Sequence, residues 1–329
     1  MTLAGDIAVV GAGIAGLACA RRLREAGAAV TVFERQAQPS GRAATLIEAA
    51  GPYDHGAQYF TVRDARFAAE VQRWRSEDVV QRWTGRIVAM DRRDVKDKTG
   101  SAERFVAVPG MRRLGVHLAR GIDVRLSTPV LALQSAGERW RLLGEGGELG
   151  RFSTVLLAMP SGQAAALLDG LTRLAAVART VDWQPCWAVT VALAHPSGAD
   201  FEGAFINDDP ILGWAALDSA KPRRGRVDGV AERWVLHAHP AWSARYAGLG
   251  EDEVSRWLAR AFSARLRGKP MPQYARAVRW DHAMPVNPLA QPCLWDPAQR
   301  LGAAGDWCGG PRIEGAYLSG LALAEAALQ

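Results

Sequence analysis

The sequence of 329 residues predicts an α/β protein with two domains, one built on a parallel sheet and the other of α+β type, with a mixed sheet and helices. At the N-terminus, the β-branched run 6–10 leads at once into a glycine-rich turn and an Ala/Leu/Arg-rich helix. Near the C-terminus, a second strand-like run, 300–304, is followed by Gly-Asp. Between them, runs 181–193 and 233–238 are rich in Val and Trp and predict strands of a different sheet.

The first turn has the GxGxxG pattern. Gly11 permits the tight turn, Gly13 lets the backbone approach a pyrophosphate, and Gly16 lets the helix pack close to the strand. Free N–H groups at the helix N-terminus, around Ile14 and Ala15, favour phosphate. The spacing therefore predicts a Rossmann-type domain that binds an adenine dinucleotide.

The residues that follow extend this site. Glu34 ends the second predicted strand about 20 residues after the turn, where a carboxylate accepts hydrogen bonds from the adenosine ribose. We expect its neighbour Arg35 to contribute as well. Gly41 and Arg42 form a pair that is typical of flavoproteins, and such an Arg can reach the pyrophosphate. The glycine motif alone does not separate FAD from NAD.

The C-terminal motif supplies the second half of a flavin site. Asp306 follows the predicted strand directly, where its carboxylate can bind the ribityl hydroxyls. A helix that begins near Glu314 would direct its positive dipole end at the flavin and stabilise the anionic reduced form. The predicted contacts from this end are Gly305, Asp306, Glu314, Gly315 and Ala316. Two distant motifs on one cofactor predict noncovalent FAD, with Cys308 facing the pocket wall.

Taken together, these motifs resemble the flavin-containing amine oxidase superfamily, and the resemblance implies that family's two-domain architecture. The stretch 54–60, DHGAQYF, resembles the renalase branch, especially its bacterial members. The resemblance implies that this stretch passes beside the flavin ring. Ala57 and Gln58 would contact the cofactor, Gln58 and Tyr59 would lie near the isoalloxazine, and Arg63 would lie near the substrate mouth.

Weaker matches follow at 108–111, 155–160, 234–243 and 279–285. Trp280 would form one side of the site for a flat aromatic substrate, and Trp214 is a weaker candidate for the same role. His237, His239 and His282 could hydrogen-bond a substrate carboxamide, and Arg279 could lie near the substrate. The family commonly has a His two residues before this Trp, where this sequence has Val278. The substrate side is therefore the least complete match.

The resemblance implies a renalase-like oxidase. Such enzymes oxidise 2- and 6-dihydro isomers of NAD(P)H to NAD(P)+ by hydride transfer to flavin N5, and O₂ is reduced to H₂O₂. The partners would then be a small-molecule dinucleotide and O₂. A dihydropyridine is a ready hydride donor and needs no strong general base. This agrees with the lack of an obvious acid–base constellation in the sequence.

Three alternatives remain open at this point. A flavin amine oxidase acting on a small amine would place a Lys shortly before the C-terminal motif, but 270–300 contains none, and the chain is short for that branch. A desaturase of apolar polyenes would favour a long apolar tunnel or membrane-facing helix, which the sequence does not suggest. An FAD-binding redox sensor or interaction module without turnover is also compatible, because binding motifs do not prove catalysis.

Because dinucleotide motifs lie at both ends, the FAD-binding domain is predicted to be discontinuous. We assign 1–70, 105–160 and 285–329 to it, and 71–104 and 161–284 to the substrate domain. The charged, Gly-containing stretch 221–228 predicts an exposed loop.

Composition excludes several other classes. The net charge of +6 comes from Lys and Arg scattered among acids, which does not favour nucleic-acid binding. The four cysteines form no CxxC pair, so no metal site is expected, and they are compatible with a reducing, cytoplasmic setting. No run approaches the roughly 20 apolar residues of a membrane span, so no membrane partner is expected.

Overall fold

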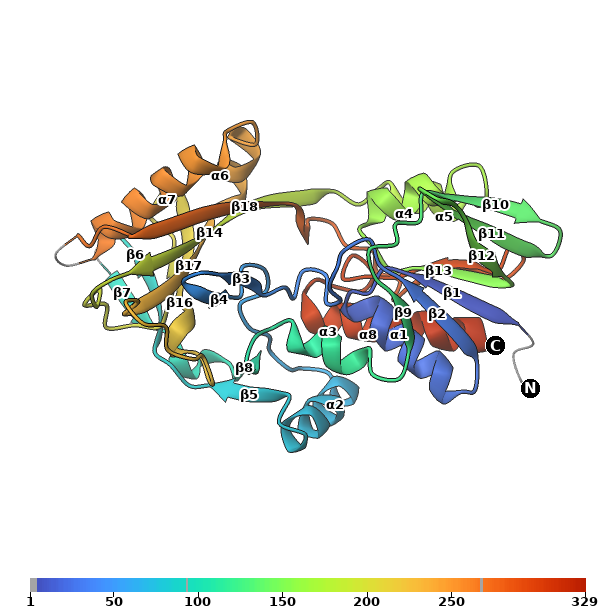
Figure 1. The fold of residues 1–329 in the computed structure, drawn as a ribbon, viewed down its shortest axis with the longest axis horizontal. Helices are drawn as coiled ribbons and strands as arrows, with labels where there is room; N and C mark the ends of the chain where they lie inside the picture. The colour runs from blue at the N-terminus through green and yellow to red at the C-terminus, as the bar shows by residue number, and fades with distance from the viewer. Residues whose placement is uncertain (1–4, 93, 267–268) are drawn as a thin grey trace.

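The computed structural model describes residues 5–92, 94–266 and 269–329. Two parts lie next to each other along the long axis of the molecule (Figure 1). One is built on a largely parallel sheet and contains the first and last described residues; the other is built on a larger, mostly antiparallel sheet. The predicted α/β fold with a second α+β part is confirmed.

The first sheet has six strands in the order β19-β20-β13-β1-β2-β9. Their bounds are β1 Asp6–Val10, β2 Ala29–Phe33, β9 Asp123–Arg125, β13 Thr154–Leu157, β19 Leu294–Asp296 and β20 Leu301–Ala303. β1 pairs in parallel with both β13 and β2, so it is central and buried on both faces. This explains its continuous apolar, β-branched sequence. β1 and β20 match the predicted strands closely.

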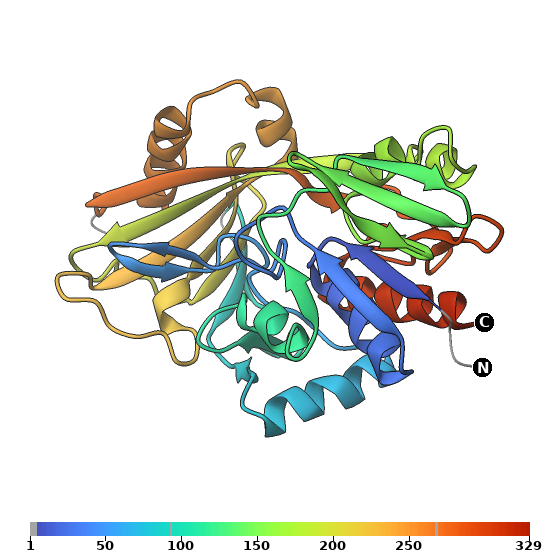
Figure 2. The ribbon, with the colours of Figure 1, turned by 45° about the vertical axis from the view of Figure 1, so that its right-hand side comes forward.

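Helices cover one face of this sheet. These are α1 (Ile14–Glu25), α3 (Arg113–Leu118) and α8 (Arg312–Leu328), with α2 (Ala65–Ser76) packed outside α8 (Figures 1 and 2). α1 ends in a Schellman motif, in which Ala28 N–H donates to the Leu23 carbonyl at 3.1 Å and Gly27 takes the left-handed φ of +86°. The predicted stop at Gly27 is thereby confirmed.

The opposite face carries a three-stranded sheet and two short helices. They are β10 (Ala132–Ala136), β11 (Arg139–Gly144), β12 (Gly147–Phe152), α4 (Ser161–Leu168) and α5 (Leu174–Ala178). α4 and α5 share one apolar core with β1 and β13. This packing favours a domain boundary near residue 182 in place of the expected one at 160.

The second sheet has seven strands in the order β18-β14-β17-β16-β15-β6-β7. Their bounds are β6 Ile87–Asp91, β7 Asp94–Asp97, β14 Trp183–Leu193, β15 Gly203–Ile206, β16 Leu212–Leu217, β17 Glu232–Ala238 and β18 Tyr274–Pro285. α6 (Pro240–Arg245) and α7 (Glu251–Arg265) cover one face through a shared apolar core. The other face is turned toward the first part, and the long strands β14 and β18 reach across to it (Figure 1).

The remaining elements are short. They are β3 (Leu46–Glu48), β4 (Gly51–Tyr53), β5 (Val80–Trp83), β8 (Arg104–Ala107) and the 3-10 turns η1 (Thr99–Ser101) and η2 (Asp218–Ala220). Across the described part of the chain, every helix is too short or too polar to cross a bilayer.

Candidate dinucleotide and substrate site

The glycine turn has the geometry that a bound pyrophosphate requires. Gly11 has φ +107°, and its N–H donates to the Phe33 carbonyl at 2.7 Å. A Cβ on Gly16 would overlap the Gly11 carbonyl oxygen, so only glycine lets α1 approach this closely. A Cβ on Gly13 would meet no atom within 4 Å. The turn is tight on its protein side and open on the side where phosphates would lie.

The N-terminus of α1 borders this opening. Gly13 is the N-cap residue and supplies no side-chain cap, so the helix N–H groups of Ile14 to Gly16 are free to donate to an anion, and Leu17 N–H begins the intrahelical bonds. Ile14 and Ala15 are buried. The described residues fit a dinucleotide phosphate here without rearrangement.

Glu34 is held beside the turn. It is 7% exposed; its Oε2 accepts from Ala12 N–H at 2.8 Å and its Oε1 from Gln36 N–H at 2.9 Å. A carboxylate oxygen accepts more than one hydrogen bond, so both oxygens retain capacity for ribose hydroxyls. Arg35 is exposed, and its charge is one of those that lower the pKa of His282.

A chain of close contacts leads from the turn toward the second sheet. A Cβ on Gly41 would lie 3.2 Å from the Gly13 Cα. Ala57 N–H donates to the Arg42 carbonyl at 2.9 Å, and a Cβ on Gly56 would overlap that same carbonyl. The turn, residues 41–42 and the stretch 54–60 are therefore in contact one with the next, and an extended dinucleotide bound at the turn would follow them.

Arg42 and Asp306 meet midway along this path. The guanidinium donates to both carboxylate oxygens, at 2.9 and 2.6 Å, and to the Ala283 carbonyl at 3.2 Å. It lies 5.0 Å from the Trp183 ring centroid. His282 packs edge-on against Trp183, and burial lowers the pKa of its imidazole. His282 thus belongs to the Arg42 group.

The C-terminal motif is only partly free for a cofactor. The Glu314 carboxylate accepts from the backbone N–H groups of Arg63 and Asp64, at 2.7 and 2.8 Å, so it anchors that loop. Its side chain is therefore occupied, which leaves backbone N–H groups of the first turn of α8 for a ligand. The Arg63 side chain is exposed. Cys308 is buried, and burial raises the pKa of its thiol, which agrees with a wall position.

The remaining predicted contacts at this end are backbone positions. Gly305 N–H donates to Ser319 Oγ at 3.0 Å, and a Cβ on Gly315 would overlap the Gly310 carbonyl. Gly315 and Ala316 lie in the first turn of α8 and are partly exposed.

One row of side chains crosses the face of the second sheet that is turned toward 54–60. Directly paired residues of neighbouring strands point to the same face. The row comprises Val278, Ala188, His237, Trp214 and Phe205. It is aromatic and apolar and carries no carboxylate. Val278, at the position where the resemblance leads one to expect a His, pairs with small Ala188.

His55 links this row to the stretch 54–60. Its carbonyl accepts from Trp280 Nε1–H at 3.1 Å and from His237 Nε2–H at 3.3 Å. Its ring stacks on Trp280 with centroids 5.0 Å apart. Burial lowers the pKa of His55 to about 4 and that of His237 to about 4. Both imidazoles are therefore neutral near pH 7.

Tyr59 continues the aromatic lining. Its ring centroid lies 5.8 Å from that of Trp214 and 6.1 Å from that of Trp83, and the Arg104 guanidinium lies 5.4 Å away.

Of the predicted substrate-side residues, the structure brings Tyr59, Trp280 and His237 to the stretch 54–60. The Arg63 side chain is exposed, and His282 lies beside Arg42 and Trp183. The expectation that Arg279 lies near the substrate is wrong. Strand alternation places its side chain on the opposite face from Trp280, on the α6/α7 side, where it donates to the Ala247 carbonyl. His239 hydrogen-bonds the Ile206 carbonyl at 3.1 Å.

The predicted exposed loop 221–228 is wrong at two positions. Lys221 is 2% exposed and Arg224 is 8% exposed, because both pair with buried carboxylates. Lys221 Nζ lies 2.8 Å from Asp218 Oδ1, and Arg224 bonds Asp54. We call Asp54, Asp218, Lys221 and Arg224 the buried ion cluster. Sequence reasoning missed it because the two acids lie 164 residues apart.

Ionisation within the cluster is balanced by its own charges. Burial, together with the charge of Asp218, raises the pKa of Asp54 against the opposing effect of Arg224 and Lys221. Burial also opposes ionisation of Asp218, but Lys221 and Arg224 outweigh it and lower the pKa of Asp218. Neither acid is left to bind a ligand cation.

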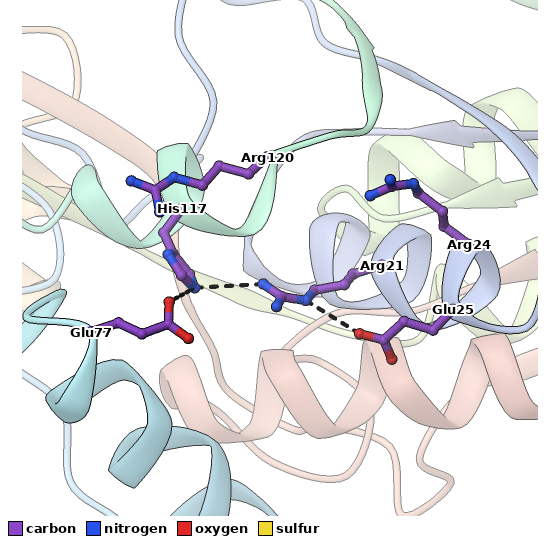
Figure 3. A pocket seen from close by; sticks show the side chains of 6 residues that line it. All are labelled: Arg21, Arg24, Glu25, Glu77, His117 and Arg120. Atoms are coloured by element: carbon purple, nitrogen blue, oxygen red, sulfur yellow. Dashed lines mark hydrogen bonds and ion pairs between the residues drawn. The ribbon is translucent and has the colours of Figure 1, made fainter.

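A separate cavity of about 230 Å³ lies at the far end of α1 (Figure 3). It is lined by Arg21, Arg24, Glu25, Glu77, His117 and Arg120. Arg24 is ten residues beyond Ile14, about 15 Å along the helix axis from the phosphate end. Its internal contacts, the Arg21–Glu25 ion pair and the approach of His117 to Glu77 at 3.6 Å, make it a surface polar network and not part of the dinucleotide site. Among the described residues, no group of His, Cys, Asp or Glu could hold a metal ion.

Comparison with known proteins agrees with this geometry. A family model described as an NAD(P)-binding Rossmann-like domain matches residues 9–72. Over 58 residues the chain is 48% identical to the hydroxyneurosporene desaturase of Cereibacter sphaeroides. That match spans 18% of this chain and only 12% of the desaturase, so it concerns a single segment.

Solved structures match over nearly the whole chain. A proposed protoporphyrinogen oxidase from Exiguobacterium sp. 255-15 has a TM-score of 0.76 at 13% identity and covers 99% of both chains. Cyclohexylamine oxidase from Brevibacterium oxydans IH-35A has a TM-score of 0.74 at 14% identity and covers 98% of both. Putrescine oxidase bound to putrescine has a TM-score of 0.71 at 14% identity, covering 97% of this chain and 98% of that one. The chain has the fold of these oxidases.

Proposed function

We propose that this chain is an FAD-dependent oxidoreductase that oxidises dihydronicotinamide dinucleotides, the 2- and 6-dihydro isomers of NAD(P)H. The observation that carries the proposal is the row on the second sheet. It offers an aromatic and apolar surface with one neutral imidazole, that of His237, and no carboxylate, and the stretch 54–60 opposite it adds the neutral imidazole of His55. Such a surface suits a flat, neutral ring.

The cofactor side of the proposal rests on the glycine turn, Glu34 and the path along 41–42. These groups would hold an adenine dinucleotide at one end and would leave its other end beside 54–60. FAD, when bound, accepts a hydride and passes two electrons to O₂. The reaction then balances as dihydronicotinamide, O₂ and one proton giving oxidised nicotinamide and H₂O₂.

The protein residues orient the substrate and exclude water. Trp280 provides a ring face, and its indole N–H is already committed to the His55 carbonyl, so the ring is fixed in place. Tyr59 and Trp214 form the other wall. No group is required to abstract a proton, because a dihydropyridine loses a hydride directly.

An amine substrate is less well supported by these side chains. A protonated amine would need an unpaired carboxylate, and among the described residues Asp54 and Asp218 are both committed to Lys221 and Arg224. Two of the fold relatives named above, cyclohexylamine oxidase and putrescine oxidase, are named for amines, so amines belong in the test as a comparison arm.

The test is anaerobic reduction of the purified protein. It is mixed with borohydride-reduced NAD+, which contains the dihydro isomers. The absorbance of the flavin is followed at its usual band, about 450 nm. Ordinary NADH and a set of primary amines are the comparisons. Bleaching by the isomer mixture with formation of NAD+ supports the proposal; bleaching by an amine alone would replace it.

A matched pair of variants links the activity to the site. Trp280→Leu removes the ring that stacks on His55, whereas Trp257→Leu removes an exposed Trp on α7. We expect the first to slow reduction at least about tenfold, or about 1.4 kcal/mol, and the second to leave it unchanged. Equal effects would show that Trp280 does not contact the substrate.

A further inference from the structure

Lys221 is unusual within this chain. Only four of its 40 Lys and Arg residues are lysines. Lys96 and Lys269 are exposed and Lys98 is half-buried, whereas the Lys221 side chain has no exposed surface. A chain that otherwise uses Arg places its one buried Lys in the centre of the molecule.

The ammonium group of Lys221 joins the two parts of the fold. It comes from the loop after η2, on the substrate side, and its Nζ donates to Asp218 Oδ1 at 2.8 Å. It also donates to Gln58 Oε1, on the cofactor side, at 3.2 Å. Asp54 Oδ2 lies 3.7 Å away, and the Trp83 ring centroid lies 5.6 Å away.

This contact fixes the orientation of the Gln58 amide. With its oxygen toward the ammonium, the NH₂ group donates to the carbonyls of Asp54 and Gly56. Turning the amide over would place NH₂ against an ammonium and leave two carbonyls without a donor. The Gln58 amide thus cross-links the stretch 54–58 through its own backbone carbonyls, and the hydrogen bond from Lys221 keeps the amide in this orientation.

The stretch that is fastened in this way lines the path of the dinucleotide. Gly56 contacts Arg42 and the Trp280 ring, and the His55 carbonyl receives the Trp280 and His237 hydrogen bonds. A shift of this backbone would therefore move the ring surface against which the substrate packs.

We propose that Lys221 is a positioning residue for the reaction, acting through the Gln58 amide to set the backbone of 54–58 between cofactor and substrate. This inference rests on the proposed function for its kinetic test. A compact ammonium suits the place, because its tetrahedral donors can serve an acid and an amide in different directions, whereas a guanidinium presents a planar fork. Asp218 and Asp54 compensate its charge.

The experiment uses four variants of the full chain with FAD bound. Lys221→Met removes the donor, Gln58→Leu removes its acceptor, and a third variant combines them. Lys96→Met makes the same chemical change on exposed β7. Because Lys221→Met leaves the cluster with an excess negative charge, Lys221→Met/Asp218→Asn is added to keep it neutral.

We expect Lys221→Met and its charge-neutral version to retain FAD and to lower the limiting rate of flavin reduction at least about tenfold (about 1.4 kcal/mol). The apparent substrate Kd should change much less. Gln58→Leu should give a similar loss, and the combined variant should be no slower than either single variant. Lys96→Met should behave as the parent protein.

Three results would overturn the inference. The first is an unchanged reduction rate with only a lower Tm, which means a purely structural cluster. The second is multiplication of the two single losses, which means that Lys221 does not act through Gln58. The third is failure of both Lys221 variants to hold FAD while Lys96→Met holds it.

A measurement that needs no substrate tests the role of Lys221 independently of the proposed function. Visible circular dichroism of the bound flavin reports the asymmetry of its surroundings. Lys221→Met and Gln58→Leu should change it in the same way even if no dihydronicotinamide reduces the protein. An unchanged spectrum in both variants would contradict the positioning role of Lys221 and would leave the proposed function unaffected.

Discussion

Two glycines three residues apart are expected to respond to the same substitution in opposite ways. Gly13 has φ −74° and ψ 179°, which alanine adopts freely, and an added Cβ would meet no protein atom within 4 Å. At Gly16 an added Cβ would overlap the Gly11 carbonyl oxygen and lie 3.0 Å from Ala158 Cβ. The first position is open toward the cofactor, and the second is closed by the protein.

The expected magnitudes follow from this geometry. Gly13→Ala changes an N-cap residue and should alter the stability of the FAD-free protein by about 1 kcal/mol or less. It should weaken FAD binding at least about tenfold, since the methyl group would occupy the space of the pyrophosphate (about 1.4 kcal/mol per factor of ten). Gly16→Ala forces α1 away from β1 and should cost about 1–3 kcal/mol of stability, as other overpacked sites do.

The assay separates folding from binding. Thermal unfolding of the FAD-free proteins gives the stability change, at about 2–4 °C per kcal/mol for a protein of this order of size. Titration with FAD, followed by flavin fluorescence, gives the Kd. If Gly13→Ala bound FAD as tightly as the parent, or if Gly16→Ala unfolded at the parent Tm, the assignment of open and closed sides would be wrong.

Three further results are expected. Glu34→Gln should weaken FAD binding and cost about 1–3 kcal/mol of stability, because an amide NH₂ would face the N–H of Ala12 or Gln36; parental FAD affinity would argue against the ribose contact. Burial lowers the pKa of His55 to about 4, so the unfolded chain binds more protons, and stability present above about pH 6.5 should be lost as pH falls toward 4. The loss is at most about 3 kcal/mol, and His55→Asn should flatten this part of the unfolding curve; an unchanged slope would contradict it. Denaturation should release all yellow colour, and flavin that stays with the precipitate would show a covalent bond.

The dinucleotide half of the site could be predicted in detail because its determinants are local. A strand, a GxGxxG turn and a helix occupy contiguous sequence, and Gly16 answers a steric demand set by Gly11 within the turn, whereas Gly11 itself is closed off by Ala158, which follows β13. β1 and the stop of α1 at Gly27 therefore match the prediction closely. Glu34 belongs to the same local unit, since β2 pairs with β1.

The substrate half was less predictable because its residues are brought together by sheet pairing. Arg279 and Trp280 are adjacent in sequence, yet strand alternation sends them to opposite faces of β18. His282, two residues further on, lies with Arg42 and Trp183. The sequence offers the residue types but not the face on which each lies.

The sequence by itself determined the fold class, the strand β1 and the place of the dinucleotide turn, because short-range sterics and apolar patterning specify them. Only the tertiary structure decided which titratable groups are buried together. The charged run 221–228 has the composition of an exposed loop. Lys221 and Arg224 are nevertheless buried, because they form ion pairs with the buried carboxylates of Asp54 and Asp218. Burial of an ion depends on its partner, and that partner is fixed by contacts far apart in the chain.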